Sequence, residues 1–306
     1  MDITIIGGTG HIGRHLVPML VREGHRITIA SRGISPLPED AEWQSVKAVT
    51  IDYGNDNWAQ VIRDTNAEVV VDILQRDSPL LYDTIKDSVG HFVLCGSIWM
   101  FGMARSVPTP DETQGACLSA AYAERFEQML EVKNRAARDG VAFTALMEPN
   151  ICGPYKVPLD CRGGRSRAEH QSYQKGNPVT LPAPGNTLIG PCDGEDVARS
   201  FLCAIANRKA ANGQLFNVGA AYSLTMTEFV ETYAQIHKVK IPINYVSWKD
   251  FIENIVPQPE AYWHFQYNMC PDISKISKAL GYHPQFTPEQ AMERAIAWMN
   301  ETGLLP

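Results

Sequence analysis

Short apolar runs alternate with helix-like stretches through the first half of the chain. The runs with the length and composition of buried strands span residues 3–6, 26–30, 46–51, 69–74, 92–95 and 143–147. After the first of them, Ile12, Leu16 and Leu20 recur at four-residue spacing, which predicts one apolar face of a helix. Strands without a polar face, separated by helices, indicate a parallel sheet that is covered on both sides. We therefore predict an α/β fold built on a doubly wound parallel sheet.

The pattern changes after Pro149. Residues 150–192 are rich in glycine, proline and polar side chains, which predicts a region dominated by loops. On either side of it, residues 122–137 and 195–206 have the pattern of helices, and residues 215–218 have that of a short strand. Regular structure is therefore expected to resume beyond the loops.

Two capping-box patterns mark helix starts in the second half, at 225–228 and at 287–290, where a proline also occupies the first helical position. The second half is thus a mixture of short strands and helices. We expect a dinucleotide-binding domain over residues 1–150 and a smaller, mixed α/β substrate-binding region over 151–306. Residues 190–220, approximately, are expected to return to the first domain.

Composition narrows the class of protein. The chain has 306 residues, of which 44% are hydrophobic, and this is enough to build the core of one or two domains. Its net charge of -7 argues against a nucleic-acid partner or an anionic membrane surface. The seven cysteines include no Cys-x-x-Cys pair, so we expect reduced thiols and no metal site. With no signal-peptide pattern and no apolar run of about 18 residues, we expect a cytoplasmic protein without a membrane span.

A glycine-rich segment, Gly-Gly-Thr-Gly-His-Ile-Gly, joins the first strand to the first helix. In such a segment Gly7 permits a tight turn, Gly10 lets the backbone approach a pyrophosphate, and Gly13 allows close packing of helix and strand. The N–H groups and the dipole at the start of the helix attract phosphate. The segment therefore predicts a Rossmann domain, in preference to a purely structural turn. Its predicted cofactor-binding residues are Gly7, Thr9, Gly10, His11, Ile12 and Gly13.

The end of the second strand selects between nicotinamide cofactors. An acidic residue there binds the ribose 2′-hydroxyl of NAD, but this chain has Ser31 and Arg32. Because a guanidinium suits a 2′-phosphate, we favour NADP(H) over NAD(H). The alternative is that Arg32 is a solvated surface residue. Asp52, after the third strand, is a candidate partner for the adenine amino group or a simple turn former, and Leu74 is a further candidate cofactor contact.

An ordered series of motifs runs through most of the chain. Besides the glycine-rich segment they are CGSIWMFG at 95–102, MEPNICGP at 147–154, GEDVAR at 194–199, FNVG at 216–219 and DISKISKALGYHP at 272–284. With this series the sequence resembles the short-chain dehydrogenase/reductase superfamily, in its extended and atypical branches of the NAD-dependent epimerase/dehydratase type. The resemblance implies hydride transfer at a nicotinamide, a serine that orients the substrate oxygen, and a tyrosine that moves a proton with the help of a lysine.

The resemblance places the catalytic serine at Ser97 and the tyrosine at Tyr122. It breaks at the lysine position four residues later, which holds Phe126. Without an ammonium group beside it, a tyrosine titrates nearer to a free phenol, with a pKa of about 10, and is a weak base at neutral pH. Three interpretations remain open: Arg125 supplies the charge, other residues move the proton, or the site is chemically silent and the fold serves binding.

Other candidate site residues lie at strand ends or in the loops that should cover the sheet. They are Trp99, Met100, Glu148, Asn150, Tyr155, His170 and Tyr262. Trp99 and Met100 favour an apolar substrate, whereas Glu148 is either an acid/base group or a carboxylate paired with an arginine. Family members that act on nucleotide sugars usually have arginines at the positions of Ile189 and Glu148. The basic run at 162–167 either replaces those arginines for a substrate diphosphate or is a solvated loop.

These observations predict an NAD(P)(H)-dependent oxidoreductase that acts on a small carbonyl or hydroxyl compound. The first alternative is a non-catalytic nucleotide-binding sensor or scaffold, because the resemblance includes chloroplast RNA-binding proteins that also lack the Tyr–Lys pair. The second is an epimerase or lyase with transient hydride transfer and a tightly held cofactor. Related folds imply a homodimer formed through helices such as the one over residues 122–137.

Overall fold

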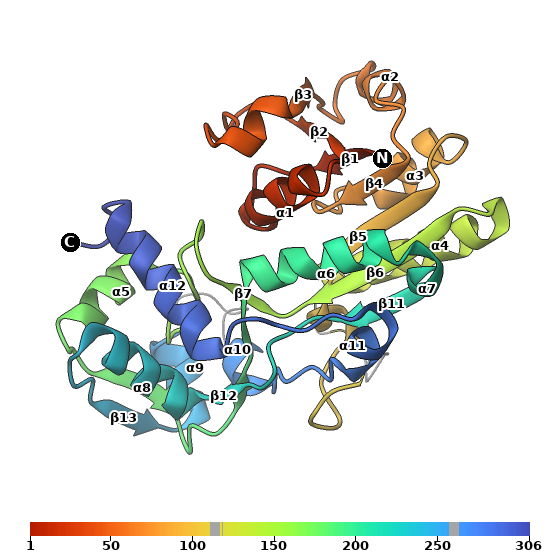
Figure 1. Ribbon diagram of the computed structural model, residues 1–306. Helices are drawn as coiled ribbons and strands as arrows, with labels where there is room; N and C mark the ends of the chain where they lie inside the picture. The colour runs from red at the N-terminus through yellow and green to blue at the C-terminus, as the bar shows by residue number, and fades with distance from the viewer. Residues whose placement is uncertain (111–116, 118, 257–262) are drawn as a thin grey trace.

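The computed structural model describes all residues except 111–116, 118 and 257–262 (Figure 1). Its centre is a parallel sheet in the order β11-β6-β5-β4-β1-β2-β3. The strands of this sheet are β1 (Asp2–Ile6), β2 (Arg26–Ser31), β3 (Lys47–Thr50), β4 (Val69–Asp72), β5 (His91–Ser97), β6 (Ala142–Glu148) and β11 (Gln214–Asn217). The order reverses between β1 and β4, as in a doubly wound Rossmann sheet. The predicted fold class is confirmed.

The strands β3 and β4 are shorter than predicted. The fourth apolar run was expected to extend to Leu74, but β4 ends at Asp72. The Asp72 carboxylate accepts hydrogen bonds from the backbone N–H groups of Leu74 and Gln75, at 3.2 and 3.0 Å, and these bonds turn the chain away from the sheet. Leu74 therefore lies in the loop after β4.

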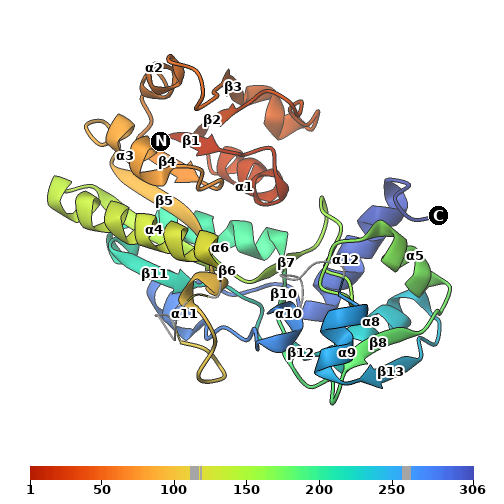
Figure 2. The ribbon, with the colours of Figure 1, turned by 180° about the vertical axis from the view of Figure 1, so that it is seen from behind.

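Helices cover both faces of the sheet. One face carries α1 (His11–Arg22) and α6 (Gly194–Ala206), which pack on each other, with the 3-10 turn η1 (Ala41–Ser45), α7 (Arg208–Ala211) and α11 (Ser274–Leu280) around them. The other face carries α2 (Trp58–Arg63), α3 (Ser78–Ile85) and α4 (Ala120–Asp139). Figure 1 shows α6 in front of the sheet, and Figure 2, from behind, shows α4. The apolar side chains of each strand alternate between two buried clusters, one under each helix layer.

The remaining elements form a smaller region beside the sheet with its own apolar core (Figures 1 and 2). Its short strand pairs are β7 (Asn150–Cys152) with β10 (Pro191–Asp193), β8 (Val179–Pro182) with β13 (Ile243–Val246), and β9 (Leu188–Ile189) with β12 (Leu224–Thr225). Its helices are α5 (Arg167–Gln174), α8 (Met226–His237), α9 (Trp248–Asn254), α10 (Trp263–Gln266) and α12 (Pro288–Glu301). Both predicted capping boxes are present, with Thr225 at the start of α8 and Thr287 at the start of α12. Among the described residues, no helix combines the length and apolarity that crossing a membrane requires.

Candidate functional site

The glycine-rich turn after β1 has the backbone geometry that its sequence requires. Gly7 has a φ of +84° and donates its N–H to the carbonyl of Ala30 at the end of β2, at 3.1 Å. A Cβ atom on Gly13 would overlap the backbone of Gly8, so α1 can pack against the turn only through a glycine. Among the described residues, no side chain caps the N-terminus of α1. The first N–H groups of a twelve-residue helix are therefore available to an anion in front of the turn.

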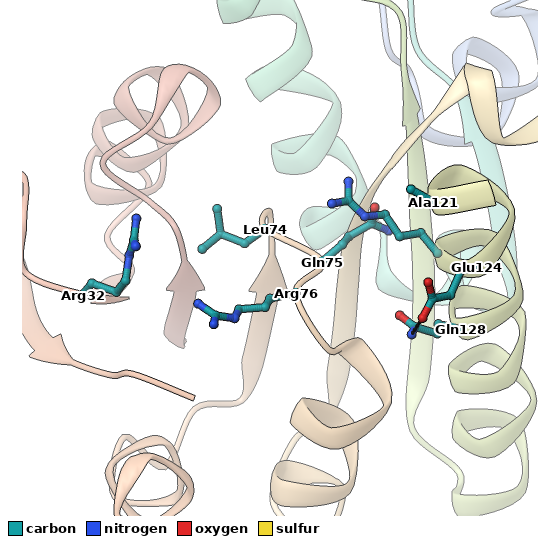
Figure 3. Close-up of a pocket in the computed structure, with 8 residues that line it drawn as sticks. Arg32, Leu74, Gln75, Arg76, Ala121, Glu124 and Gln128 are labelled. Atoms are coloured by element: carbon teal, nitrogen blue, oxygen red, sulfur yellow. Dashed lines mark hydrogen bonds between the residues drawn. The ribbon is translucent and has the colours of Figure 1, made fainter. Parts of the chain in front are cut away.

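A cleft of about 470 Å³ lies beside this turn, at the carboxyl edge of the sheet. It is bounded by the end of β2, the loop after β4 and one face of α4. The lining residues are Arg32, Leu74, Gln75, Arg76, Ala121, Glu124, Arg125 and Gln128. Figure 3 shows Arg32 and Arg76 reaching into the same space from neighbouring loops, with Glu124 and Gln128 on α4 across from them. This is the crevice in which open α/β sheets bind their ligands.

The loop after β4 is held in shape by a buried carboxylate. In addition to the two backbone bonds already described, Asp72 accepts a hydrogen bond from the Ser78 hydroxyl at 2.7 Å. Burial raises the pKa of Asp72, and these hydrogen bonds together with the nearby charge of Arg125 oppose that rise. The loop presents Leu74, which is 51% exposed, directly above Gly7, where a Cβ atom would lie 2.6 Å from the leucine Cγ. The predicted cofactor contact Leu74 thus forms the wall of the cleft opposite the glycine-rich turn.

The cleft carries an excess of positive charge. Arg32, Arg76 and Arg125 line it, and within the described part of the chain none of the three forms an ion pair. The guanidinium of Arg76 lies 5.7 Å from the centre of the Tyr53 ring. The single carboxylate in the lining, Glu124, accepts a hydrogen bond from Gln128. An anion is the ligand that this set of side chains suits. Arg76 was missed at the sequence level, although its position four residues after the end of a central strand was a usable signal.

The face that α4 turns toward the cleft differs from the expected one. Ala121 and Arg125, one helical turn apart, line the cleft. Tyr122 and Phe126 instead pack against the apolar cluster on the α4 side of the sheet, and Phe126 meets the ring of Phe101 edge-on at 5.8 Å. The residue at the expected lysine position is therefore a packing residue. Of the three interpretations left open, a charge supplied by Arg125 agrees with this geometry.

Ser97 and Glu148 end the two neighbouring strands β5 and β6 and are direct partners in the sheet register. The Ser97 hydroxyl caps the short 3-10 turn η2 (Ile98–Phe101) and accepts a hydrogen bond from the Trp99 N–H at 3.4 Å. Glu148 is 3% exposed, and among the described residues neither of its carboxyl oxygens has a hydrogen-bond partner, so the structure does not show the alternative in which an arginine pairs with it. Burial raises the pKa of Glu148 well above its ordinary value. Asn150, two residues on, is also buried, and its Nδ2 has no partner.

The structure places several other predicted residues away from the cleft. The His11 ring lies against the start of α6, about 2.9 Å from where a Cβ of Gly194 would sit, and burial lowers its pKa to about 3. At the turn itself, His11 therefore offers a ligand its backbone N–H. The Ser31 side chain accepts a hydrogen bond from the Gly33 N–H, and the Asp52 side chain accepts one from the Gly54 N–H. Each side chain therefore stabilises the turn that follows it. Tyr262 lies outside the described residues.

Four other candidates also lie outside the lining of the cleft. His170 was expected in a polar loop but lies in α5, fully buried, where its Nε2 is 3.1 Å from the Pro158 carbonyl and the rings of Tyr173 and Tyr233 enclose it. Tyr155 lies outside the lining of the cleft, with its ring centre 4.9 Å from that of His15 and tilted by 52° to it. Trp99 and Met100 belong to η2 and contact the apolar cluster on the α4 side.

The arginines of the basic run at 162–167 have hydrogen-bond partners within the smaller region, although Arg167 is exposed. Arg162 pairs with Glu169 at 2.8 Å, and Arg165 donates to the carbonyls of Val157 and Ile151. Arg167 donates to the carbonyl of Gly303. These arginines therefore tie the loop to the smaller region. The described residues contain no cluster of His, Cys, Asp or Glu with the arrangement of a metal site.

Comparison with known proteins agrees with the motif series. The model of the NAD dependent epimerase/dehydratase family matches residues 3–80 and 80–219. Among curated proteins, the chain is 24% identical to the chloroplast stem-loop binding protein of 41 kDa b from Arabidopsis thaliana, over 93% of this chain and 75% of that protein. It is 23% identical to 2'-dehydrokanamycin reductase from Streptomyces kanamyceticus, over 81% and 69% of the two chains. The resemblance drawn from the motifs is confirmed.

The fold also has close counterparts among solved structures. The UDP-glucuronic acid 4-epimerase of Bacillus cereus, in complex with UDP-glucuronic acid and NAD, superimposes with a TM-score of 0.75. The match covers 99% of this chain and all of that one, at 16% identity. At this identity the likeness establishes the fold, a Rossmann sheet with a smaller region beside its carboxyl edge.

Proposed function

Because the chain belongs to the NAD-dependent epimerase/dehydratase family, we propose that it is an NADP(H)-dependent oxidoreductase that interconverts a small carbonyl compound and its alcohol. Family membership gives an enzyme that uses a nicotinamide dinucleotide. The preference for the phosphorylated cofactor, and the small substrate, are the proposed parts. The observation that carries the proposal is the cleft beside the glycine-rich turn, with its unpaired arginines.

The residues of the cleft fit such a cofactor. The uncapped start of α1 and the exposed backbone of Gly10 would receive the pyrophosphate. Arg32, beyond the end of β2, would pair with the adenosine 2′-phosphate, and Leu74 would cover the adenosine ribose. The nicotinamide supplies hydride chemistry when the cofactor is bound. Ser97, at the end of β5, would orient the substrate oxygen through its hydroxyl.

Arg125 would take the place of the family's lysine. It reaches the cleft from α4, and among the described residues it forms no ion pair. A guanidinium stays protonated at any physiological pH, so it can hold a ribose hydroxyl or an anionic group, but it cannot accept a proton. The proton that a carbonyl reduction needs must therefore come from another group.

Binding of NADPH and NADH to nucleotide-free protein, measured by calorimetry, tests the proposal. We expect the wild type to prefer NADPH and the Arg32→Gln variant to lose about 10- to 100-fold in NADPH affinity, which corresponds to one charge-assisted contact of roughly 1.5–3 kcal/mol. NADH affinity should stay within twofold. Arg63→Gln, which removes an exposed arginine from α2, is the matched control.

Three outcomes separate the alternatives. An unchanged preference in the Arg32 variant would show that the 2′-phosphate is recognised elsewhere. Failure of both nucleotides to bind would reject the proposed activity and favour a binding role without chemistry. Binding without net NADPH consumption across a panel of aldehydes and ketones would favour an epimerase, which returns the hydride to its own product.

A further inference from the structure

Glu148 lies at a strand end beside Ser97, the residue that the proposed function assigns to orienting the substrate oxygen. Ser97 and Glu148 are register partners at the carboxyl ends of β5 and β6. Adjacent strands lie about 4.8 Å apart, and paired residues of a parallel sheet point to the same face. Two residues earlier, the register partners Cys95 and Leu146 both lie in the core under α1 and α6, so Ser97 and Glu148 belong to that face too. A small ligand held by the Ser97 hydroxyl would therefore be within reach of Glu148.

Among the described residues, no group forms a hydrogen bond with the carboxyl group of Glu148. The titratable groups that interact with it are Cys95 on β5, Cys192 on β10 and Tyr282 after α11. The Tyr282 hydroxyl is already used, because it donates to the Gly219 carbonyl at 2.9 Å. Both carboxyl oxygens of Glu148 consequently remain without a partner. A buried polar group in this state destabilises a protein by about 1–3 kcal/mol and is unusual unless a ligand completes it.

The same surroundings favour protonation of the group. Desolvation disfavours the carboxylate, and no cation is among the groups that shift its pKa, so burial alone raises it. Burial favours the protonated form of Glu148, and in this form the group has a proton to donate. Asn150, with its unpartnered Nδ2, adds a second donor at the same strand end.

The expected proton donor, by contrast, belongs to the other helix layer. Tyr122 is partly buried and packs against the cluster under α4, on the side of the sheet opposite Glu148, and its neighbour on α4 that lines the cleft is Ala121. Arg125 cannot give up a proton at neutral pH. Reduction of a carbonyl leaves an alkoxide that must be protonated, and a buried neutral acid meets this requirement.

We infer that Glu148 is the catalytic acid of this enzyme and donates the proton to the substrate oxygen when a carbonyl is reduced; this rests on the proposed function. In that step the carbonyl carbon accepts a hydride from the reduced nicotinamide, and the electron pair of the C=O π bond moves to oxygen. The oxygen takes the proton of Glu148, which breaks the O–H bond of the acid and leaves a carboxylate and an oxidised cofactor. The carboxylate then regains a proton from water. In the oxidative direction Glu148 accepts the proton.

Infrared spectroscopy and steady-state kinetics test this role together. At pH 7 the wild type should show the carbonyl stretch of a protonated carboxylic acid, and NADPH should shift it. The band should be absent from Glu148→Gln and present in Glu127→Gln, a control on the exposed side of α4. With any aldehyde or ketone that the wild type reduces, Glu148→Gln should lose about 100-fold or more in kcat while its NADPH affinity stays within twofold. Glu148→Asp should restore part of the rate.

The pH profile separates a proton donor from a structural residue. In the wild type, log kcat should fall with unit slope above the raised pKa of Glu148, and this limb should vanish in the glutamine variant. Wild-type kcat in Glu148→Gln, or a wild-type spectrum without the acid band, would overturn the inference and leave the proposed function intact. If no carbonyl in the panel is reduced, a band that NADPH does not shift overturns it as well. A wild type that binds no nucleotide rejects the proposed function, and this inference with it.

Discussion

At one end of the sheet's carboxyl edge, around β1 and β2, the proposed site rests on the backbone; at the other, around β5, β6 and α4, it rests on single side chains. The first end needs glycines that no other residue can replace, an uncapped helix start and an arginine beyond a strand. The second end needs one donor and one acid at the right strand ends. Backbone requirements leave a clear mark in a sequence, whereas side-chain roles can move from one element to another while the fold persists.

The clearest example of a role carried by a different element is the proposed proton donor. The helix that carries the family's tyrosine and lysine is present, but here it turns Ala121 and Arg125 to the cleft and packs Tyr122 and Phe126 into the core. The carboxyl group of Glu148, at the end of β6, is buried and has no hydrogen-bond partner among the described residues. We propose that the cofactor end keeps the role it has in the family, whereas the chemical end relies on Glu148.

The largest effect is expected at Gly13. In Gly13→Ala the new Cβ would overlap the backbone of Gly8, so the turn and α1 must separate. We expect a loss of about 2–4 kcal/mol in the free energy of unfolding and no measurable NADPH binding. Gly24→Ala is the control: Gly24 has a φ of +79° but open space around its Cβ, and should cost about 1 kcal/mol and leave binding unchanged. Equal losses in urea denaturation would mean that close packing of the turn is not what Gly13 supplies.

Glu148 is expected to lower the free energy of unfolding of the ligand-free protein as pH rises. Its pKa is raised in the folded state, so the unfolded chain ionises first as pH rises, and folding loses stability between the ordinary pKa of a glutamate and the raised one. Glu148→Gln has no such dependence. The variant should match the wild type at about pH 4 and be more stable by about 1–3 kcal/mol at pH 7. The measurement is urea denaturation across that range.

Glu127→Gln, on the exposed side of α4, is the matched control and should show no such divergence. Parallel stability curves for the wild type and Glu148→Gln would mean that Glu148 ionises freely in the folded protein. That would remove the physical basis for its role as an acid.

The sequence alone was enough for the sheet, the glycine-rich turn and both capping boxes, because each depends on local periodicity or on residues with special backbone freedom. It was not enough for the facing of α4. The pattern Tyr122-x-x-x-Phe126 marks a helix stripe, but which stripe meets the cleft depends on how α4 packs on the sheet, and a shift of one residue rotates the helix by 100°. Nor does composition reveal that Glu148 lacks a partner, because partners come from distant segments. His170 illustrates the converse: a polar context in sequence became an aromatic core in space.

The smallest effect is expected on nucleotide affinity when Arg125 is replaced, and it can be compared with the effect of replacing Arg32. Arg32 and Arg125 line the same cleft, one beyond β2 and the other on α4. If Arg32 pairs with the 2′-phosphate, its loss weakens NADPH alone. Arg125, on the side where the family's lysine holds the nicotinamide ribose, meets a part that both cofactors share. Arg125→Gln should therefore weaken NADPH and NADH equally, by about three- to tenfold, or roughly 1 kcal/mol, the contribution of one exposed hydrogen bond.

Calorimetric titration of both variants with both nucleotides gives four ratios to compare. Arg125→Lys should recover most of the lost affinity, because a lysine keeps the charge though not the geometry. A selective loss of NADPH in Arg125→Gln would mean that the two arginines act on one phosphate and that the ends of the cleft are not distinct. No loss of either nucleotide would assign Arg125 to the substrate side, and the missing lysine would then have no replacement among the residues of α4 that face the cleft.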